Sequence, residues 1–348
     1  MKVILVSPLP PPVGGIATWT EGYKQYCDKN EISLFIVNNA LQGFRVSQES
    51  SKRSLIDEMR RSRKIFRDLI QKIKKEKPDV VHLNTSCSRF GIFRDCICAL
   101  LSRVCHLPVI LQCHCNIEDQ IHGTMAKHAF RLMTSMCSKV LVLNRFSAAF
   151  AKKYAGEKVL IIPNFADENS VFERCGFNDK IQRALYVGHV RVEKGAREII
   201  KAAAMLPNVH FTLIGPVQQD IEEKARTSNV EMPGAMSHDK VLKQLKEADV
   251  FLFPSYTEGF SNALLEAMAC ELPIIATDVG ANAEMLENKG GIIIPTADAD
   301  SLKNAIIELA DVSARTQMGK WNGAKVRNEY MIDMVAKRII RIYREVTA

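Results

Sequence analysis

The sequence contains no long apolar run. None of its 348 residues lies in a stretch approaching the roughly 18 to 20 apolar residues that a membrane-spanning helix needs. The N-terminus "MKVILVSPLPPP" has an apolar stretch too short for a signal peptide, and it predicts a first strand instead. Internal repeats and low-complexity segments are lacking as well. We therefore expect a cytoplasmic protein, and the length is sufficient for two domains of ordinary size.

A disulfide framework and a zinc site are also not indicated. The ten cysteines are scattered and lack the even spacing of short secreted proteins. Cys96 and Cys98, like Cys113 and Cys115, are separated by one residue, whereas zinc-binding cysteines usually have two to four residues between them. We expect buried thiols rather than a metal site at these positions.

Acidic residues are scarce in one segment only. Residues 52–77 hold eleven Lys or Arg against four Asp or Glu, while the rest of the chain has 36 basic and 35 acidic residues. The segment predicts a helix whose apolar face holds Leu55, Met59, Phe66, Leu69, Ile70 and Ile73. Either this helix packs on a sheet with its charge solvated, or its basic face binds an anionic membrane surface. No nucleic acid partner is expected.

Short apolar runs alternate with helical patterns along the whole chain. Strands are predicted at 3–6, 32–37, 80–83, 109–111, 140–143, 159–162, 184–187, 210–214, 250–253, 274–276 and 291–294. Short buried strands separated by helices are typical of parallel sheets covered on both faces. We expect an α/β protein with two Rossmann-like parallel-sheet domains facing a cleft, where such sheets bind ligands.

The polar, turn-rich stretch "IPNFADENSVFERCGFNDKIQ" near the middle of the chain interrupts this rhythm. We place the first domain at 1–165, a linker at 166–182 and the second domain at 183–330. The final segment, 331–348, is an amphipathic helix that can cross back to the first domain.

Three strand-to-helix junctions combine glycine with a helix N-terminus. They are Gly14-Gly15 after the first strand, "VGHVRVEKG" after 184–187, and "TEGFSNALLE" after 250–253. In the last of these the helix should begin near Ser261 or Asn262, either of which can cap it. Glycine lets the backbone approach a ligand, and the free N–H groups and positive dipole end of a helix suit phosphate. An ordinary tight turn or solvated loop is the alternative at each junction. Because Gly14-Gly15 is not a G-x-G-x-x-G fingerprint, a dehydrogenase is disfavoured.

These segments, in this order, resemble the retaining nucleotide-sugar glycosyltransferases of family four, which have the GT-B fold. The resemblance runs from "GGI" through "PDVVHLN", "VILQCH", "VLVLN" and "IIPNF" to "VGHVRVEKG". It continues with "FTLIGP", "ADVFLFPSYTEGFSNALLEAMACELPIIATDVGANAEML" and "GIIIPTADADSL", so it covers nearly the whole chain. Its most specific parts are the glutamate pair Glu258 and Glu266, with seven residues between them, and the Lys194-Gly195 loop.

The resemblance implies a role for each candidate residue. His114 approaches the transferred sugar, Lys194 neutralises the departing diphosphate, and Glu258 faces the donor sugar, so these three are the candidate catalytic residues. Glu266 hydrogen-bonds the ribose hydroxyls of the donor nucleotide. The other donor-binding candidates are Gly14, Gly15, Gly188, Arg191, Gly259, Phe260, Ser261, Asn262, Leu264 and Leu265. The first domain then serves the acceptor and the second binds the nucleotide sugar.

Two features of the sequence bear on this resemblance. His189 stands where family members commonly carry arginine, so the phosphate clamp has one fixed charge fewer unless Arg191 replaces it. The "DAD" at Asp298–Asp300 has the appearance of the metal-binding signature of the other major glycosyltransferase fold, but its position before a helix predicts a cap. We therefore expect neither a metal requirement nor a cofactor.

The expected reaction is transfer of a hexose-type sugar from a nucleoside diphosphate sugar, in the first instance a UDP-sugar, to a hydroxyl of a glycan acceptor. We expect a lipid-linked acceptor in cell-surface polysaccharide synthesis, at the inner face of the cytoplasmic membrane; a soluble acceptor is the alternative. A nucleotide-sugar epimerase of the same fold also stays open. A glycoside hydrolase is disfavoured, because eight helical residues separate two carboxylates by about 12 Å, whereas retaining hydrolases need about 5–5.5 Å.

Overall fold

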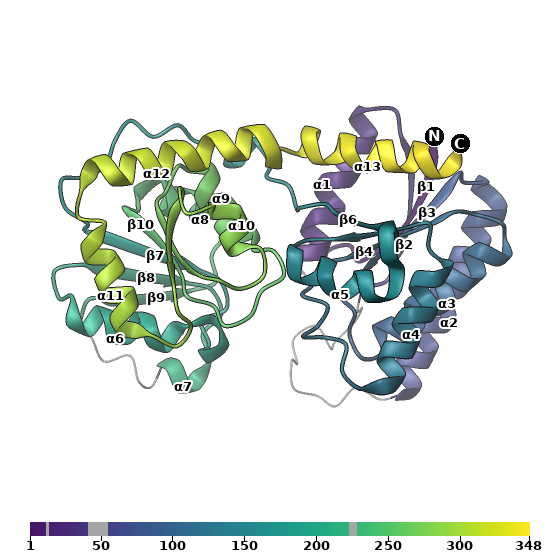
Figure 1. The fold of residues 1–348 in the computed structure, drawn as a ribbon, viewed down its shortest axis with the longest axis horizontal. Helices are drawn as coiled ribbons and strands as arrows, with labels where there is room; N and C mark the ends of the chain where they lie inside the picture. Colours follow the sequence, from purple (N-terminus) through teal and green to yellow (C-terminus); the bar gives the residue numbers. More distant parts are fainter. Residues whose placement is uncertain (12–13, 41–54, 223–227) are drawn as a thin grey trace. The chain divides into compact units, whose positions relative to one another are not determined.

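The computed structural model describes residues 1–11, 14–40, 55–222 and 228–348, which form two compact units. Unit 1 comprises Met1–Asn164 together with Ile332–Ala348, and unit 2 comprises Phe165–Met331. Each unit contains one six-stranded sheet flanked by helices (Figure 1). The predicted α/β class with two Rossmann-like parallel sheets is confirmed.

The sheet of unit 1 has the strand order β2-β1-β3-β4-β5-β6, and all neighbours are parallel. Its strands are β1 (Lys2–Ser7), β2 (Ser33–Asn38), β3 (Val80–Thr85), β4 (Val109–Cys113), β5 (Lys139–Val142) and β6 (Val159–Ile161). Its helices are α1 (Gly15–Lys29), α2 (Leu55–Glu76), α3 (Gly91–Val104), α4 (Gly123–Met136), α5 (Arg145–Ala155) and α13 (Ile332–Thr347).

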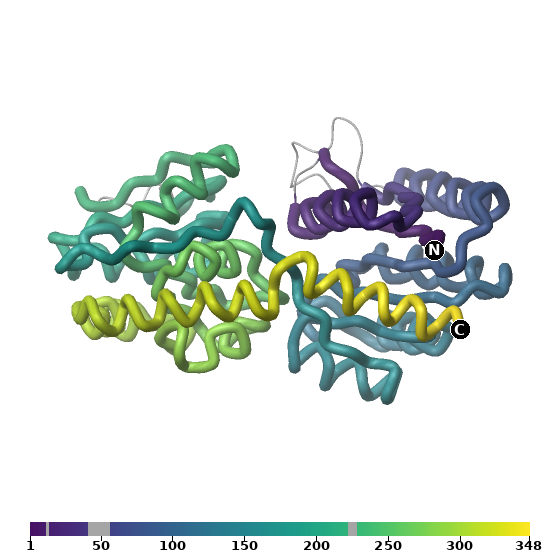
Figure 2. The backbone as a smooth tube through the Cα atoms, turned by 90° about the horizontal axis from the view of Figure 1, so that it is seen from above, coloured from purple at the N-terminus to yellow at the C-terminus, as the bar shows by residue number. Residues whose placement is uncertain are grey.

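Alternation along the strands of unit 1 supplies two buried faces. Val81, Leu83 and Leu111 belong to a core that also contains buried side chains of α2, α3, α4 and α5. The residues between them point to the opposite face, where His82 contacts Trp19 of α1 and Tyr343 of α13. The C-terminal helix therefore completes the fold of unit 1, and Figure 2 shows its yellow tube beside the elements of that unit.

The sheet of unit 2 has the order β12-β11-β10-β7-β8-β9, again fully parallel. Its strands are β7 (Arg183–Val187), β8 (His210–Ile214), β9 (Val230–Gly234), β10 (Val250–Phe253), β11 (Ile274–Thr277) and β12 (Gly291–Ile294). Its helices are α6 (Ala196–Met205), α7 (Gln219–Glu222), α8 (His238–Glu247), α9 (Asn262–Ala269), α10 (Asn282–Leu286), α11 (Ala299–Glu308) and α12 (Val312–Lys325).

The eleven predicted strands are confirmed, but β9 was not predicted. This strand lies at the edge of its sheet and pairs only with β8 among the described strands. Its residues are half-buried or exposed, and it includes Pro233, which sheets accept mainly at edges. A short edge strand interrupted by Glu231 and Pro233 therefore lacks the apolar run by which the other strands were predicted.

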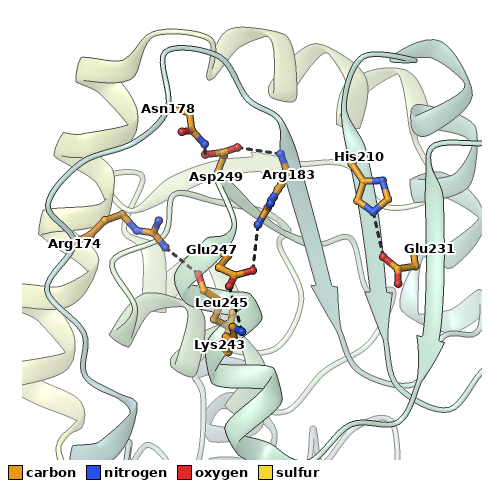
Figure 3. A network of polar contacts seen from close by, with 9 residues as sticks. All are labelled: Arg174, Asn178, Arg183, His210, Glu231, Lys243, Leu245, Glu247 and Asp249. Atoms are coloured by element: carbon orange, nitrogen blue, oxygen red, sulfur yellow. Dashed lines mark hydrogen bonds and ion pairs between the residues drawn. The ribbon is translucent and has the colours of Figure 1, made fainter.

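The segment predicted as a linker, residues 166–182, instead packs on unit 2 (Figure 3). Buried Arg174 donates from Nη2 to the carbonyl of Leu245 at 2.9 Å. Asn178 donates from Nδ2 to Asp249 at 2.9 Å, and the backbone N–H of Arg183 donates to the other oxygen of the same carboxylate at 2.9 Å. The polar side chains that suggested a linker thus satisfy buried polar groups of unit 2.

The basic helix is α2, although residues 52–54 and the side chain of Leu55 lie outside what the structure describes. Ile65, Leu69 and Ile73 form its packed face, whereas Met59, predicted on that face, is 65% exposed. The prediction for Met59 is wrong because, at 3.6 residues per turn, it lies on a different side of the helix from Ile65.

Candidate functional site

The predicted donor residues of unit 2 lie where the strand order of its sheet reverses. Strand β7 pairs with β8 on one side and β10 on the other, so consecutive connections depart in opposite directions. The loops after β7 and β10 leave the carboxyl ends of these neighbouring strands at that reversal. Open α/β sheets bind ligands at such a topological switch point.

Two glycines allow close backbone packing at this point. Gly195 has φ +75°, and a Cβ there would lie 2.2 Å from the carbonyl oxygen of Pro254. Gly280 has φ +57°, and a Cβ there would lie 2.4 Å from the carbonyl oxygen of Glu258. Both positions are therefore restricted to glycine by backbone angle and by space. Gly195 lets the loop after β7 pack against the loop after β10, and Gly280 packs against the backbone of Glu258.

Lys194 and Glu258 form the central ion pair of the site. Lys194 Nζ lies 2.5 Å from Glu258 Oε1 and also donates to the carbonyl of Thr257 at 3.3 Å. The two side chains are 18% and 13% exposed, so the pair is screened from bulk water but still accessible. The structure thus brings together two predicted catalytic residues that are 64 positions apart in the sequence.

Helix α9 begins next to this pair. Its cap is Ser261, whose Oγ accepts the N–H of Leu264 at 3.1 Å, while the Ser261 carbonyl accepts the N–H of Leu265. This confirms that the helix begins at the predicted position. The side chains of both leucines are buried, and their N–H groups already have partners. A phosphate reaches the Leu264 N–H only by displacing the Ser261 hydroxyl.

Phe260, another predicted donor residue, packs inside unit 2. It is 9% exposed and meets Tyr330 edge to face, with ring centroids 5.8 Å apart. Gly259 accepts the N–H of Ala281 at 3.1 Å through its carbonyl. The turn before α9 is therefore fixed from both sides, which orients Glu258 before any ligand binds.

Glu266 lies in the middle of α9 beside His238, the first residue of α8. The imidazole Nδ1 is 3.9 Å from Glu266 Oε1, and the glutamate side chain is 23% exposed. Burial raises the pKa of Glu266 above its ordinary value, and His238 opposes this shift. His238 was not predicted, because no motif in "MSHDK" marks it; only the packing of α8 on α9 places it here.

The basic side chains of the loop after β7 are more exposed than Lys194. Arg191 is 46% exposed on its side chain and has Glu193 at 3.9 Å. His189 is exposed, and its carbonyl accepts the hydroxyl of Tyr186 at 3.0 Å. Gly188, with φ +152°, lies against that tyrosine ring. Arg191 is thus available to an anion, since an exposed ion pair at this distance is weak.

His114 belongs to unit 1 and directly follows β4. Its backbone N–H donates to the carbonyl of Thr85 at 2.8 Å, and its ring meets Trp19 edge to face at 5.1 Å. Burial lowers the pKa of His114 to about 3, an effect that Asn164 partly offsets. The imidazole is therefore neutral near pH 7, and it is suited to donating or accepting a hydrogen bond rather than to carrying charge.

Gly14 and Gly15 mark the start of α1 in unit 1. Gly14 has φ −169°, which any residue adopts, and a Cβ there would meet nothing within 4 Å. Gly15 is the first residue of the helix and is exposed. Among the described residues, neither backbone angle nor packing thus requires glycine at position 14, and its contact with the donor stays a prediction.

Asp298, in the "DAD" segment, caps α11. Its carboxylate accepts the N–H of Ser301 at 2.9 Å and the hydroxyl of the same serine at 2.7 Å, which confirms the predicted cap. These bonds lower the pKa of Asp298. Among the described residues no cluster of three or more His, Cys, Asp or Glu has the arrangement of a metal site.

The family match to known proteins falls within one of the two units. Residues 167–324, all within unit 2, match the family described as glycosyl transferases group 1. An uncharacterized glycosyltransferase of Methanocaldococcus jannaschii is 24% identical over 374 residues, which span 100% of this chain and 99% of the relative. The N,N'-diacetylbacillosaminyl-diphospho-undecaprenol alpha-1,3-N-acetylgalactosaminyltransferase of Campylobacter jejuni is 29% identical over 175 residues, or 48% of this chain and 46% of that protein.

Among solved structures, HepE of Anabaena in complex with UDP and glucose superposes with a TM-score of 0.75. The identity is 16%, and the superposition covers 99% of this chain and 100% of that one. This likeness shows the GT-B fold, as predicted. The family match and the relatives support a glycosyltransferase of the GT-B superfamily. In the described part of the chain, no helix is both long and apolar enough to cross a membrane.

Proposed function

We propose that the protein is a retaining glycosyltransferase of family four that moves a hexose-type sugar from a UDP-sugar to a hydroxyl of a lipid-linked glycan. The observation that carries this proposal is the pair of Lys194 and Glu258 at the switch point of unit 2, with Glu266 in the helix that follows. HepE, which shares the fold, is a structure with UDP and glucose, and this supports the choice of donor.

Lys194 supplies the charge that the leaving group needs. When the bond between sugar and diphosphate breaks, negative charge grows on the diphosphate, and a nearby ammonium lowers the free energy of that state. In the structure the ammonium is held by Glu258 at 2.5 Å. A bound diphosphate competes for the same ammonium, which frees Glu258 to accept hydroxyl groups of the donor sugar.

In our proposal Glu266 recognises the nucleotide rather than the sugar. Its carboxylate is mostly enclosed between α8 and α9, and a partly buried carboxylate is stabilised by hydroxyl donors. Two ribose hydroxyls supply such donors. His114, neutral and enclosed, would accordingly hydrogen-bond the transferred sugar without adding charge.

In our proposal, the donor diphosphate binds without a metal ion or cofactor. Lys194 and Arg191 come from one loop, and the N-termini of α6 and α9 begin at the same edge of the sheet. Basic side chains and helix dipoles together provide the positive potential that a divalent cation supplies in other enzymes.

Helices α2 and α3 of unit 1 support a membrane-bound acceptor. On α3, Phe93, Ile97, Leu100 and Val104 form a stripe with 40%, 41%, 50% and 67% exposure. On the adjacent α2, Arg60, Arg63, Lys64 and Arg67 are exposed. Apolar side chains beside basic ones suit the surface of an anionic bilayer. The C. jejuni relative, whose name includes diphospho-undecaprenol, supports the same acceptor class.

Arg61 is excluded from this basic surface. It lies 3.1 Å from Glu58 and also donates to the carbonyl of Asn39, so its guanidinium is occupied within unit 1. The proposed surface therefore consists of the exposed residues Arg60, Arg63, Lys64 and Arg67 of α2, together with the apolar stripe of α3.

The first test is a screen of UDP- and GDP-sugars by thermal shift, because a ligand that binds only the folded state raises the melting temperature. The sugar nucleotide that stabilises the protein is then supplied with lipid-linked and soluble glycans, and release of free UDP is followed. Acceptor-dependent release is expected with the lipid-linked glycan. Interconversion of sugar nucleotides without release identifies an epimerase, and transfer only to the soluble glycan overturns the acceptor assignment.

A further inference from the structure

Three cysteine thiols lie together at the carboxyl ends of β3 and β4 in unit 1. Cys87 follows β3, Cys113 is the last residue of β4, and Cys115 comes two residues later. Cys87 and Cys113 are buried at 1% and 0% exposure, and Cys115 is partly exposed. All three are free thiols in the structure.

Strand register accounts for the meeting of Cys87 and Cys115. The parallel ladder pairs Thr85 with Cys113, and the N–H of His114 continues it by donating to the Thr85 carbonyl at 2.8 Å. Two residues past these strand ends, the thiols of Cys87 and Cys115 lie within hydrogen-bonding reach of each other, as do those of Cys87 and Cys113. Side chains of paired positions on neighbouring strands are close enough to interact.

The backbone at Cys87 turns its thiol inward. Cys87 has φ +52°, a left-handed conformation that non-glycine residues rarely adopt, and its N–H donates to Thr85 Oγ1 at 3.0 Å. Hydrogen bonds from the thiols of Cys113 and Cys115 lower the pKa of Cys87, while the same contacts and burial raise the pKa of the other two thiols. Cys87 is therefore the member of the cluster that most readily becomes a thiolate, which is the reactive form.

We propose that Cys87 and Cys115 are a peroxide-sensitive pair that forms an intramolecular disulfide. Cys87 first releases its proton, and the thiolate attacks one oxygen of hydrogen peroxide. The O–O bond breaks to give a sulfenic acid, and the departing hydroxide takes up the released proton to give water. The Cys115 sulfur then attacks the sulfur of Cys87. The S–S bond forms as the S–O bond breaks, and the second hydroxide leaves as water with the Cys115 proton. Two thiols lose two electrons and peroxide gains them.

Cys115 is chosen over Cys113 because of its position. Cys113 is fixed by its place in β4 and is buried, whereas Cys115 lies beyond the strand and is partly exposed. A small oxidant therefore reaches the cluster from the side of Cys115. A disulfide between Cys113 and Cys115 is disfavoured, since the Cα atoms of residues i and i+2 in an extended chain lie about 6.6 Å apart, at the upper limit for a disulfide.

A disulfide between Cys87 and Cys115 affects His114, a candidate catalytic residue. His114 directly precedes Cys115, and its N–H is already bonded to the Thr85 carbonyl. Drawing Cys115 toward Cys87 restrains His114 and changes the direction of its ring. The expected consequence, a loss of sugar transfer that dithiothreitol reverses, rests on the proposed function, whereas formation of the disulfide does not.

The experiment uses the full chain with Cys105→Ser and Cys175→Ser, because these two exposed thiols could cross-link separate molecules. The protein is treated with hydrogen peroxide, alkylated, digested and analysed by mass spectrometry. We expect loss of two alkylatable thiols and a cross-linked peptide pair that contains Cys87 and Cys115. UDP binding, measured by titration calorimetry on the same sample, should be unchanged because the nucleotide is assigned to unit 2.

Two matched variants complete the design. Cys115→Ser should abolish the cross-link, and Cys96→Ser, which removes a half-buried thiol outside the cluster, should leave it intact. The proposal is overturned if peroxide cross-links Cys87 to Cys113. It is also overturned if Cys87, Cys113 and Cys115 can all still be alkylated after peroxide treatment of the protein that retains all three. A disulfide in a protein that transfers no sugar would contradict the proposed function alone.

Discussion

At the scale of single residues, Lys194 and Glu258 are coupled so closely that each determines the state of the other. The pair is 2.5 Å apart and mostly shielded from water. Removal of one partner leaves a partly buried charge on the other, so loss of the lysine has a cost even before substrate binds. Substitutions at this pair must therefore be compared by their separate effects on binding and on turnover.

Lys194→Ala is expected to lower turnover more than it lowers affinity for the sugar nucleotide, because charge on the diphosphate is greatest in the transition state. Steady-state kinetics with a binding assay separates the two effects. Arg191→Ala, which removes the second basic side chain that we assign to the diphosphate, is measured in the same assays for comparison. Equal losses of affinity and turnover in Lys194→Ala would mean that the lysine only holds the bound donor.

Glu266→Ala is expected to weaken UDP binding by about 1–3 kcal/mol, because the ribose loses a partly enclosed acceptor. Titration calorimetry measures this, and an unchanged affinity would remove Glu266 from the donor site. In wild-type protein UDP affinity should fall with decreasing pH as Glu266 takes up a proton, and the raised pKa places this loss at higher pH than for an ordinary glutamate. His238→Ala should move the loss to still higher pH, since His238 lowers the pKa of Glu266.

At the scale of elements, the sequence predicts most of the scaffold but not how each element packs. Apolar runs identify eleven strands, and Ser261 and Asp298 are correct as caps, because these signals are local. The edge strand β9 has no such signal. Met59 was assigned to the packed face of α2, where the structure instead places Glu58 and Arg61, paired at 3.1 Å. A contact of this kind depends on the neighbouring segments, which helical periodicity does not describe.

The candidate site shows the same division. The glycine turns and the Lys194-Gly195 loop could be predicted because their spacing is contained within short segments. The contact between Lys194 and Glu258 follows only from the pairing of β7 with β10, and His238 reaches Glu266 only because α8 packs on α9. Phe260 resembles a ligand-facing residue in the sequence, yet Tyr330 provides the packing partner that encloses it.

Helix α2 carries the prediction for membrane binding. Replacement of exposed Arg63 and Lys64 by glutamate should weaken binding to anionic vesicles by at least roughly 1 kcal/mol for each basic residue removed. Vesicle sedimentation at low and high salt measures this, and wild-type binding should decrease with added salt as the charges are screened. Replacement of exposed Lys24 and Lys240 by glutamate makes the same change of net charge elsewhere and should have little effect. Equal losses in both variants would indicate attraction by net charge alone.

At the scale of the whole molecule, the two units differ in how their histidines are held. In unit 1, His82 is buried, shares a hydrogen bond of 2.6 Å between its Nδ1 and the Tyr343 hydroxyl, and lies next to His114. Burial lowers the pKa of His82 to about 3, and the neighbouring His114 adds to this effect. The histidines of unit 2, at positions 189, 210 and 238, are exposed. Acid should therefore act on the units unequally.

We expect unit 1 to unfold at a higher pH than unit 2 as the solution is acidified. A histidine whose pKa is near 6.5 in the unfolded chain and about 3 in the folded one remains neutral in the fold while the unfolded form takes up a proton. Its contribution to the free energy of unfolding is complete above pH about 6.5. As the pH decreases below that value, the contribution falls by about 1.4 kcal/mol per pH unit until the folded pKa is reached. The sequence supplies one tryptophan reporter for each unit, Trp19 and Trp321. Fluorescence of Trp321→Phe protein follows unit 1 and that of Trp19→Phe protein follows unit 2, so acid titration of the two variants separates the transitions. A single transition at one pH for both reporters, or an earlier transition at Trp321, would show that the buried histidines do not govern the acid stability of unit 1.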